Sequence, residues 1–298
     1  MSAAPAPASH RAGFALPDEQ AAWRTVDALT EVLFEGDAAV AAFERPDGRW
    51  DVTVHFAQAP DQALVRRLVA DAAGQDVAST ISFDTVEPRD WVKASLEDLV
   101  PVPAGRFVVH GAHDRARVPH NKLGIEIEAA LAFGTGHHGT TRGCLLLLDR
   151  VLKAHRPRRV LDLGTGSGVL AIAAAKALRR PVLASDIDAP SVGVARQNAR
   201  LNEVGHLVEA IRATGFSAPD FARHGPFDLV LANILANPLR QLAGPMSRQM
   251  APKGLVILSG LLTHQAAGVV AAYRARGLVP LAHLRVEGWS SLLLRSTE

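Results

Sequence analysis

The chain has 298 residues, of which 48% are hydrophobic, and its formal net charge is +2. At roughly 150 residues per domain this length allows two domains, and the single cysteine, Cys144, excludes an intramolecular disulfide framework. No apolar run reaches the roughly 18 residues that a membrane span needs, and no signal peptide begins the sequence. We therefore expect a cytoplasmic protein without a membrane partner.

The small net charge hides an asymmetry along the chain. Residues 1–86 carry six arginines and no lysine against thirteen acidic residues, a net charge of −7, so the other 212 residues carry +9. An acidic first region argues against nucleic-acid binding there and favours a basic partner. We expect no direct nucleic-acid partner for the chain. An acidic surface that aids solubility explains the same composition equally well.

Residues 1–86 are predicted to form a small ferredoxin-like α+β domain, after an Ala/Pro-rich leader (1–15) that we expect to be disordered. Apolar residues at helical or alternating spacing predict its elements in the order helix, strand, strand, helix, strand. They cover 18–34, 38–43, 50–56, 62–73 and 79–86. We find no catalytic constellation in this region and interpret it as a recognition domain.

Residues 87–127 are interpreted as a connector, because they hold Pro-rich stretches and one strand-like run at 106–110. From 128 to 298 helical and strand patterns alternate, which predicts a doubly wound parallel sheet. Five strands are expected at 159–163, 181–185, 207–211, 227–232 and 254–259. Two further strands at 278–284 and 289–295 have no convincing helix between them and predict a closing antiparallel hairpin.

The stretch V-L-D-L-G-T-G-S-G, from Val160 to Gly168, predicts a ligand site: a buried strand, a glycine turn and then a helix. Glycines tolerate positive φ and let the backbone approach a ligand closely. A dinucleotide fingerprint would need a glycine at Val169, and no phosphate-binding P-loop motif is present. The spacing is instead D-x-G-x-G-x-G, with Asp162 as its acidic residue.

The second strand of this region ends in Ser185-Asp186-Ile187-Asp188, and Asp186 follows Gly164 by 22 residues. A carboxylate at that strand end can accept hydrogen bonds from ribose hydroxyls. We assign ribose binding to Asp186 and capping of the next helix to Asp188. The helix that follows carries R-Q-N-A-R-L-N (196–202), which we expect to face mostly solvent.

Asn233 ends the fourth strand, in L-V-L-A-N-I-L, and so falls at the carboxyl edge of the sheet. Its amide both donates and accepts, so it could orient a cofactor and an incoming amine, or it could be a strand-end turn residue. A second glycine-rich loop, L-A-F-G-T-G-H-H-G-T-T, spans 131–141. Its adjacent histidines, His137 and His138, lack the partners of a zinc site, so we expect no metal.

These motifs together, with A-N-I-L-A-N-P-L and L-S-G-L-L-T-H-Q, resemble the PrmA family, closely over about 125–298 and more loosely before that. The resemblance implies the seven-stranded fold of methyltransferases that use S-adenosylmethionine (SAM), and methylation of amines of protein eleven of the large ribosomal subunit. It places the 133–136 loop near the methyl-transfer centre. The assignments are, for catalysis, Asn233, Phe133 and Thr135, and for SAM binding Phe133, Gly134, Thr135, Thr141, Asp162, Gly164, Gly166, Gly168, Asp186 and Asn233. The sequence departs from the family pattern at Glu128-Ala-Ala and at Gly139, which bears on the rigidity of the loop.

Transfer of a methyl group to an amine requires the neutral amine. At pH 7 deprotonation costs roughly 4–5 kcal/mol for a lysine and about 1 kcal/mol for an α-amine, and an apolar site around Phe133 would lower both costs. Two alternatives remain open: a lysine methyltransferase of the same fold with another target, such as an electron-transfer flavoprotein subunit, and a non-catalytic SAM-binding scaffold. A dehydrogenase is disfavoured by Val169 and by the single tyrosine, Tyr273, in a surface-like helix. We expect a monomer.

Overall fold

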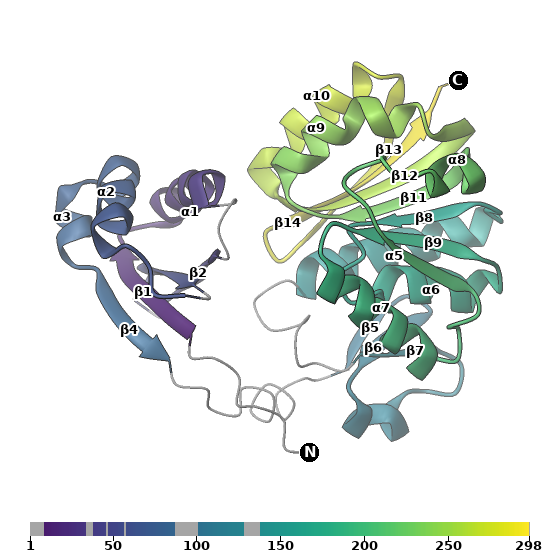
Figure 1. Cartoon of the computed structure of the whole chain (residues 1–298), viewed down its shortest axis with the longest axis horizontal. Coiled ribbons are helices and arrows are strands. Elements are labelled where there is room, and N and C mark those ends of the chain that lie inside the picture. The colour runs from purple at the N-terminus through teal and green to yellow at the C-terminus, as the bar shows by residue number, and fades with distance from the viewer. Residues whose placement is uncertain are drawn as a thin grey trace. The chain divides into compact units, whose positions relative to one another are not determined.

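The computed structural model describes residues 9–33, 38–45, 47–56, 58–86, 101–127 and 138–297. The chain divides into two compact units, Met1–Lys93 and Ala94–Glu298, which are described separately below (Figure 1). Within the described ranges no helix has the length and apolar character needed to cross a membrane.

The first unit is a four-stranded antiparallel sheet with its helices packed against it, in the order βαββαβ. The sheet order is β2-β3-β1-β4, which is the ferredoxin-like arrangement expected from the sequence. Strand β3 and helix α2 have the predicted bounds. The elements are β1 (Ser9–Leu16), α1 (Glu19–Leu33), β2 (Ala38–Glu44), β3 (Trp50–Phe56), α2 (Gln62–Ala73), α3 (Gln75–Ser79) and β4 (Ser82–Val86).

Strand β1 corrects the sequence analysis, which placed residues up to 15 in a disordered leader. The strand lies in the interior of the sheet, where it pairs with both β3 and β4. Ala12, Phe14 and Leu16 alternate along it and are all buried in the core of this unit. This alternation was a usable signal, but the neighbouring Ala/Pro-rich segment masked it. Residues 1–8 of the predicted leader lie outside the described residues.

The 87–127 segment, interpreted above as a connector, contains a three-stranded sheet of order β5-β6-β7 in its described part. Its elements are β5 (Val102–Ala104), β6 (Phe107–His110), the 3-10 helix η1 (Ala112–Arg117) and β7 (Leu123–Glu126). Phe107 and Ile125 are fully buried in the same apolar cluster as Leu148 of the large unit. This small sheet therefore belongs to the core of the second unit.

The large sheet of the second unit has seven strands in the order β10-β9-β8-β11-β12-β14-β13. Strands β10, β9, β8, β11 and β12 are parallel, and β14 pairs antiparallel with both β12 and β13. This confirms the predicted methyltransferase fold. The strands are β8 (Val160–Leu163), β9 (Val182–Asp186), β10 (Val208–Arg212), β11 (Phe227–Asn233), β12 (Met250–Leu262), β13 (Leu278–Val286) and β14 (Trp289–Ser296).

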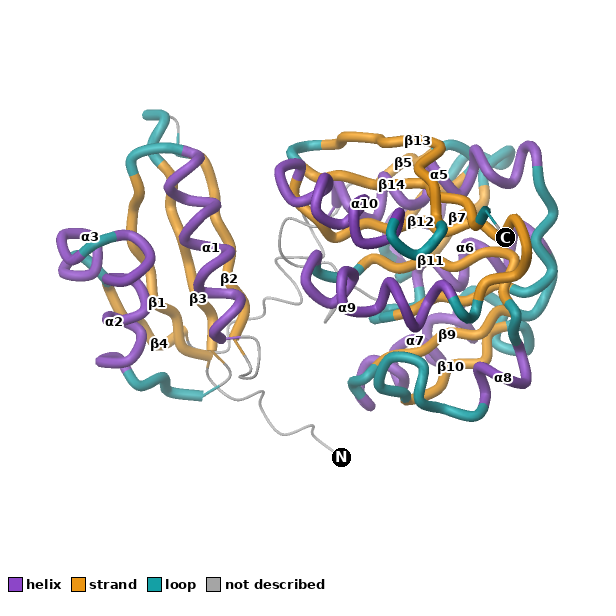
Figure 2. The backbone as a smooth tube through the Cα atoms, turned by 90° about the horizontal axis from the view of Figure 1, so that it is seen from above, coloured by secondary structure: helices purple, strands orange, loops and turns teal. Residues whose placement is uncertain are grey.

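Helices cover both faces of this sheet, as Figures 1 and 2 show. The helices are α5 (His138–Ala154), α6 (Val169–Leu178), α7 (Ala189–Leu201), α8 (Asp220–His224), α9 (Ala236–Ser247) and α10 (Ala266–Arg274). Successive residues of a strand point to opposite faces, so Val160 joins the cluster under α5, α6 and α7, while Leu161 joins the one under α8, α9 and α10. Both faces of the sheet are therefore buried.

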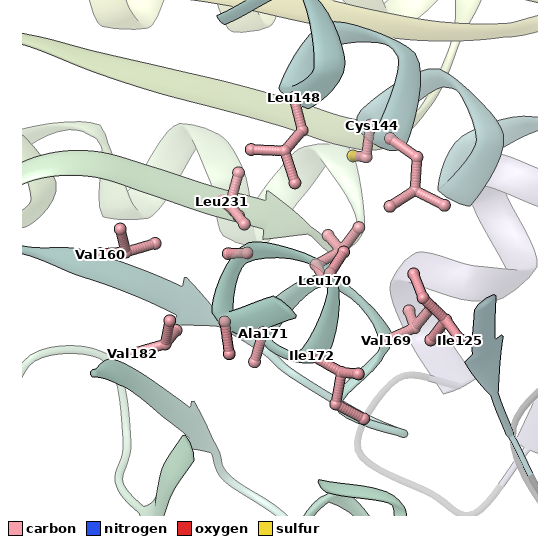
Figure 3. Close-up of a cluster of buried hydrophobic side chains, with 14 of the residues drawn as sticks. Ile125, Cys144, Leu148, Val160, Val169, Leu170, Ala171, Ile172, Val182 and Leu231 are labelled. Atoms are coloured by element: carbon pink, nitrogen blue, oxygen red, sulfur yellow. The ribbon is translucent and has the colours of Figure 1, made fainter. Parts of the chain in front are cut away.

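The first of these clusters supports the start of helix α6. Figure 3 shows side chains of α6, such as Leu170 and Ile172, packed between β8, β9 and neighbouring elements. The second cluster holds Tyr273, which is fully buried and donates its hydroxyl to Met246 Sδ at 3.6 Å. The expectation that Tyr273 lies on a surface-like helix was therefore wrong, because α10 packs that residue against α9.

Candidate functional site

The glycine turn between β8 and α6 adopts a backbone that other residues avoid. Gly164, Gly166 and Gly168 have φ values of 69°, 51° and 84°, in the left-handed region where glycine carries no steric cost. The N–H groups of Gly164 and Thr165 both donate to the carbonyl of Ser185, at 2.8 and 2.9 Å. The turn is thus fixed to the end of the neighbouring strand β9.

The three glycines meet different surroundings. A Cβ atom on Gly164 would lie 2.3 Å from Cγ2 of Ile234, and one on Gly168 would lie 3.1 Å from Cα of Ala195. A Cβ on Gly166 would meet no heavy atom within 4 Å. Gly164 therefore allows close packing against Ile234, which follows β11, and Gly168 against α7, whereas Gly166 leaves the central part of the turn open.

Asp186 faces this turn from the end of β9. Its Oδ2 accepts the N–H of Gly166 at 2.8 Å, and its Oδ1 accepts the N–H of Asp188 at 3.0 Å. The residue is half-buried, so part of the carboxylate remains available to a further donor. Asp188 accepts the N–H of Ser191 at 2.9 Å and caps α7, as predicted.

Asp162 lies below the turn and is 1% exposed. Its Oδ2 accepts hydrogen bonds from Thr165 Oγ1 at 2.6 Å and from the N–H of Ala171 at 2.9 Å. Its Oδ1 is buried without a hydrogen-bond partner among the described residues. Burial, with a smaller contribution from the nearby charge of Asp186, raises the pKa of Asp162 to about 6 against the lowering effect of these two bonds. The carboxylate holds the turn and the start of α6 together.

Asn233 ends β11 beside the first turn of α5. Its Nδ2 is 3.4 Å from Thr140 Oγ1 and 3.3 Å from Thr141 Oγ1, and it donates to both hydroxyls. Thr140 and Thr141 are buried, so the amide has a defined orientation. The structure thus brings the predicted residues Thr141 and Asn233 together at the same edge of the sheet as the glycine turn.

The sequence analysis missed two asparagines that support this site, one within α7 and one at its C-cap. It expected 196–202 to face mostly solvent, but Asn198 and Asn202 are 1% and 5% exposed. Asn198 Nδ2 donates to the carbonyl of Ser167, in the glycine turn, at 2.8 Å. The two asparagines are four residues apart, and they share the helix face of the buried Ala195 and Ala199. That spacing was the available signal.

The remaining predicted site residues, Phe133, Gly134 and Thr135, lie outside the described residues. The same is true of the rest of the glycine-rich loop up to His137. Across the ranges that the structure does describe, no three His, Cys, Asp or Glu residues form a group that could hold a metal ion.

Comparisons with known proteins agree with this architecture. The family model described as ribosomal protein L11 methyltransferase (PrmA) matches residues 19–297. A protein of Bradyrhizobium diazoefficiens named ribosomal protein L11 methyltransferase is 78% identical over 287 residues, covering 96% of this chain and 97% of that protein. One of the same name from Rhodopseudomonas palustris is 68% identical over 290 residues, covering 97% and 98%.

A solved structure shares the fold. The crystal structure of a ribosomal protein L11 methylase from Lactobacillus delbrueckii subsp. bulgaricus superposes with a TM-score of 0.60 and is 29% identical in sequence. The match covers 66% of this chain and 100% of that one.

Proposed function

Because this chain belongs to the PrmA family of ribosomal protein L11 methyltransferases, we propose that it transfers methyl groups from SAM to amines of ribosomal protein L11. The SAM assignment rests on the hydrogen bond that the N–H of Gly166 donates to Asp186 Oδ2. It places a carboxylate at the open centre of a glycine turn, at the carboxyl edge of a parallel sheet.

The described residues fit SAM. The turn is open at Gly166, where a Cβ would touch nothing within 4 Å. The half-buried Asp186 keeps acceptor capacity that suits the two ribose hydroxyls. No diphosphate is part of SAM, which agrees with a turn that lacks the dinucleotide spacing because of Val169.

SAM supplies a methyl group on a sulfonium, so the protein has to position a neutral amine in line with that carbon. We assign this positioning to Asn233, whose Nδ2 is oriented by Thr140 and Thr141. Its amide oxygen can accept a hydrogen bond from the N–H of the amine. The roles of Phe133 and Thr135 beside the transferred methyl group are part of the same proposal.

The name shared by the relatives favours L11 over the other protein targets considered above. A ribosomal protein substrate also favours a cytoplasmic location, and the basic character of such proteins suits the net charge of −7 on residues 1–86. The non-catalytic scaffold is disfavoured because the glycines, Asp186 and Asn233 are all present.

The chemical part of the proposal is tested by mapping the product. L11 methylated by this enzyme with deuterated-methyl SAM is digested, and the labelled residues are located by mass spectrometry. We expect the label on lysine side chains or on the N-terminal α-amine. A label confined to arginine, glutamine or carboxylate side chains would overturn the assignment of amine chemistry.

A further inference from the structure

The edge of the large sheet opposite the glycine turn carries exposed cations. In a parallel sheet the strands begin, and the preceding helices end, at one edge, whereas the ligand site lies at the other. Exposed basic residues stand at these strand beginnings. Arg159 donates from its Nη1 to the carbonyl of Gly225, and we give the name basic edge to six others. They are Arg158, Arg179, Arg180, Arg248, Lys253 and Arg276.

The basic edge is not neutralised by carboxylates within the described part of the chain. The ion pairs of the large unit there involve other basic side chains. Asp228 is the acidic residue beside Arg158, and its Oδ2 accepts the backbone N–H groups of Arg158 and Arg159 at 2.8 and 2.9 Å. The side-chain charges of the basic edge are therefore available to an external anion.

Two of these cations converge. A Cβ atom on Gly244 of α9 would lie 3.5 Å from Nε of Arg276 and 3.8 Å from Nη1 of Arg248. The two guanidinium groups therefore lie on the same side of α9, with a residue between them that has no side chain. Like charges brought together repel unless an anion bridges them.

Two other members occupy backbone positions that favour glycine. Arg179 has φ 53° and Lys253 has φ 60°, where a side chain is strained and glycine is the usual residue. A cation in a last helical turn can be explained by the helix dipole. Lys253 lies within β12, so the dipole does not account for it.

We propose that the basic edge binds the phosphate backbone of RNA. Guanidinium groups match phosphate oxygens with paired hydrogen bonds, and a stripe of cations suits a repeating anion better than a single carboxylate. The described large apolar residues that are exposed are Val32, Leu64, Ile187, Leu201, Leu235 and Leu281, and none is an aromatic or a neighbour of the basic edge in sequence. Because no such side chain adjoins the basic edge in the described sequence, we expect binding through phosphates, without base stacking or membrane insertion.

RNA is also the polyanion that fits the proposed substrate, because a ribosomal protein belongs to an RNA–protein particle; this step of the argument rests on the proposed function. The sequence analysis expected no direct nucleic-acid partner from the acidic residues 1–86. The basic edge lies wholly in the other unit of the chain, so the proposal departs from that expectation because of a surface that residues 1–86 do not contain.

The test is fluorescence anisotropy of a labelled 20-base-pair RNA duplex titrated with the full chain at several salt concentrations. We expect the logarithm of the association constant to fall linearly with the logarithm of the salt concentration, because phosphate contacts release counterions. The double variant Arg248→Glu/Arg276→Glu should bind at least tenfold more weakly at 0.1 M salt, with a shallower salt dependence. Arg179→Glu/Arg180→Glu should act similarly and tests the other half of the edge.

The matched control is Arg240→Glu/Arg285→Glu. It changes the net charge equally. Arg240 lies in the first half of α9, the helix that Arg248 caps, and Arg285 lies near the end of β13, the strand that Arg276 precedes. We expect it to bind RNA within twofold of the parent chain. An equal loss of RNA binding in Arg248→Glu/Arg276→Glu and in the control variant would overturn the proposal. So would the absence of RNA binding by the parent chain at 50 mM salt, or equally tight binding of the parent to poly-glutamate or anionic vesicles.

Methylation of free L11 by Arg248→Glu/Arg276→Glu is measured in parallel and should equal that of the parent. This measurement separates the two proposals. Loss of RNA binding with full methylation would show that the basic edge binds RNA and takes no part in methyl transfer. Absence of L11 methylation by the parent chain would instead contradict the proposed function and leave the RNA-binding result unaffected.

Discussion

The side-chain amide of Asn202 binds both backbone groups of Glu126. Its Oδ1 accepts the N–H of Glu126 at 2.9 Å, and its Nδ2 donates to the carbonyl of Glu126 at 2.6 Å and to that of Asn198 at 2.9 Å. Asn198 in turn holds the carbonyl of Ser167. Helix α7 therefore ties the end of β7, two residues before the 128–137 segment, to the glycine turn.

Replacing Asn202 with alanine should destabilise the fold. It would leave the N–H and carbonyl of Glu126 buried without their partner, which costs about 2–4 kcal/mol in the free energy of unfolding. The free energy of unfolding is measured by urea denaturation monitored by circular dichroism. The exposed turn residue Asn121 serves as control, and Asn121→Ala should change stability by less than about 0.5 kcal/mol. Similar stabilities for the two variants would show that the Asn202 bonds contribute little.

Asp186 and Asp188 allow ligand binding to be separated from helix capping. Asp186→Ala should raise the Kd for SAM roughly 10- to 100-fold, because it removes a charged acceptor from the ribose site. Asp188→Ala should lower stability by about 1 kcal/mol through loss of the α7 cap, with the Kd within threefold of the parent. Calorimetric titration of both variants measures the Kd for SAM, and thermal unfolding measures their stability. An unchanged Kd in Asp186→Ala contradicts the ribose assignment.

Alanine at the glycine turn should give graded effects. Gly166→Ala places a side chain at φ 51° in open space, so we expect a stability loss of about 1–2 kcal/mol from the left-handed backbone alone. Gly164→Ala adds a contact at 2.3 Å with Ile234 and should lose more. Unfolding midpoints of the two purified variants check this order, and the reverse order would mean that Ile234 moves freely out of the way.

Asn233→Ala should lower the rate of methyl transfer without unfolding the protein. A misplaced amine reacts roughly 100-fold more slowly, so single-turnover rates at saturating SAM should fall by about that factor. Asn237, in the same A-N-I-L-A-N-P-L stretch, is exposed and accepts a bond from Arg240. Asn237→Ala should retain the parent rate. A parent-like rate in Asn233→Ala would remove the positioning role.

Asp162 should give stability an unusual pH dependence. Burial raises its pKa in the folded state from 3.8 to about 6, so between these values the folded state binds more protons than the unfolded state. Its contribution to stability is therefore largest at low pH and falls as pH rises from about 4 to 6. Asp162→Asn should flatten that part of the stability curve relative to the parent, in paired urea denaturations from pH 4 to 8. Parallel curves would contradict the raised pKa.

The sequence predicted the large sheet well because its central strands β8, β9, β11 and β12 are largely buried on both faces, so each contains a short apolar run between turn or helix signals. Asp162, the three glycines, Asp186 and Asn233 follow such runs, and the parallel topology brings them to one edge. Their roles toward SAM remain predictions. Phe133 and Thr135 lie outside the described residues, so the structure adds nothing to their assignment.

What the sequence could not supply depended on tertiary contacts. Strand β1 has a weak sequence signal, because Ala12 and Gly13 are poor strand formers, and its pairing with β3 and β4 fixes it in the sheet. Asp114, in the polar D-R-A-R stretch of 114–117, is 2% exposed, and its Oδ1 accepts a hydrogen bond from Arg117 Nη1 at 2.8 Å. Asn198 and Asn202 have polar side chains on a buried helix face, and only the backbone groups they bind explain that placement.

The central claim, SAM-dependent methylation of L11, is tested most directly by intact-mass analysis. Purified unmethylated L11 is incubated with this enzyme and SAM, beside a histone-like basic protein of similar size. We expect mass increases in steps of one methyl group on L11 and none on the control protein. No added mass on L11, in a preparation whose SAM binding has been verified calorimetrically, would contradict the claim, as would equal methylation of both proteins.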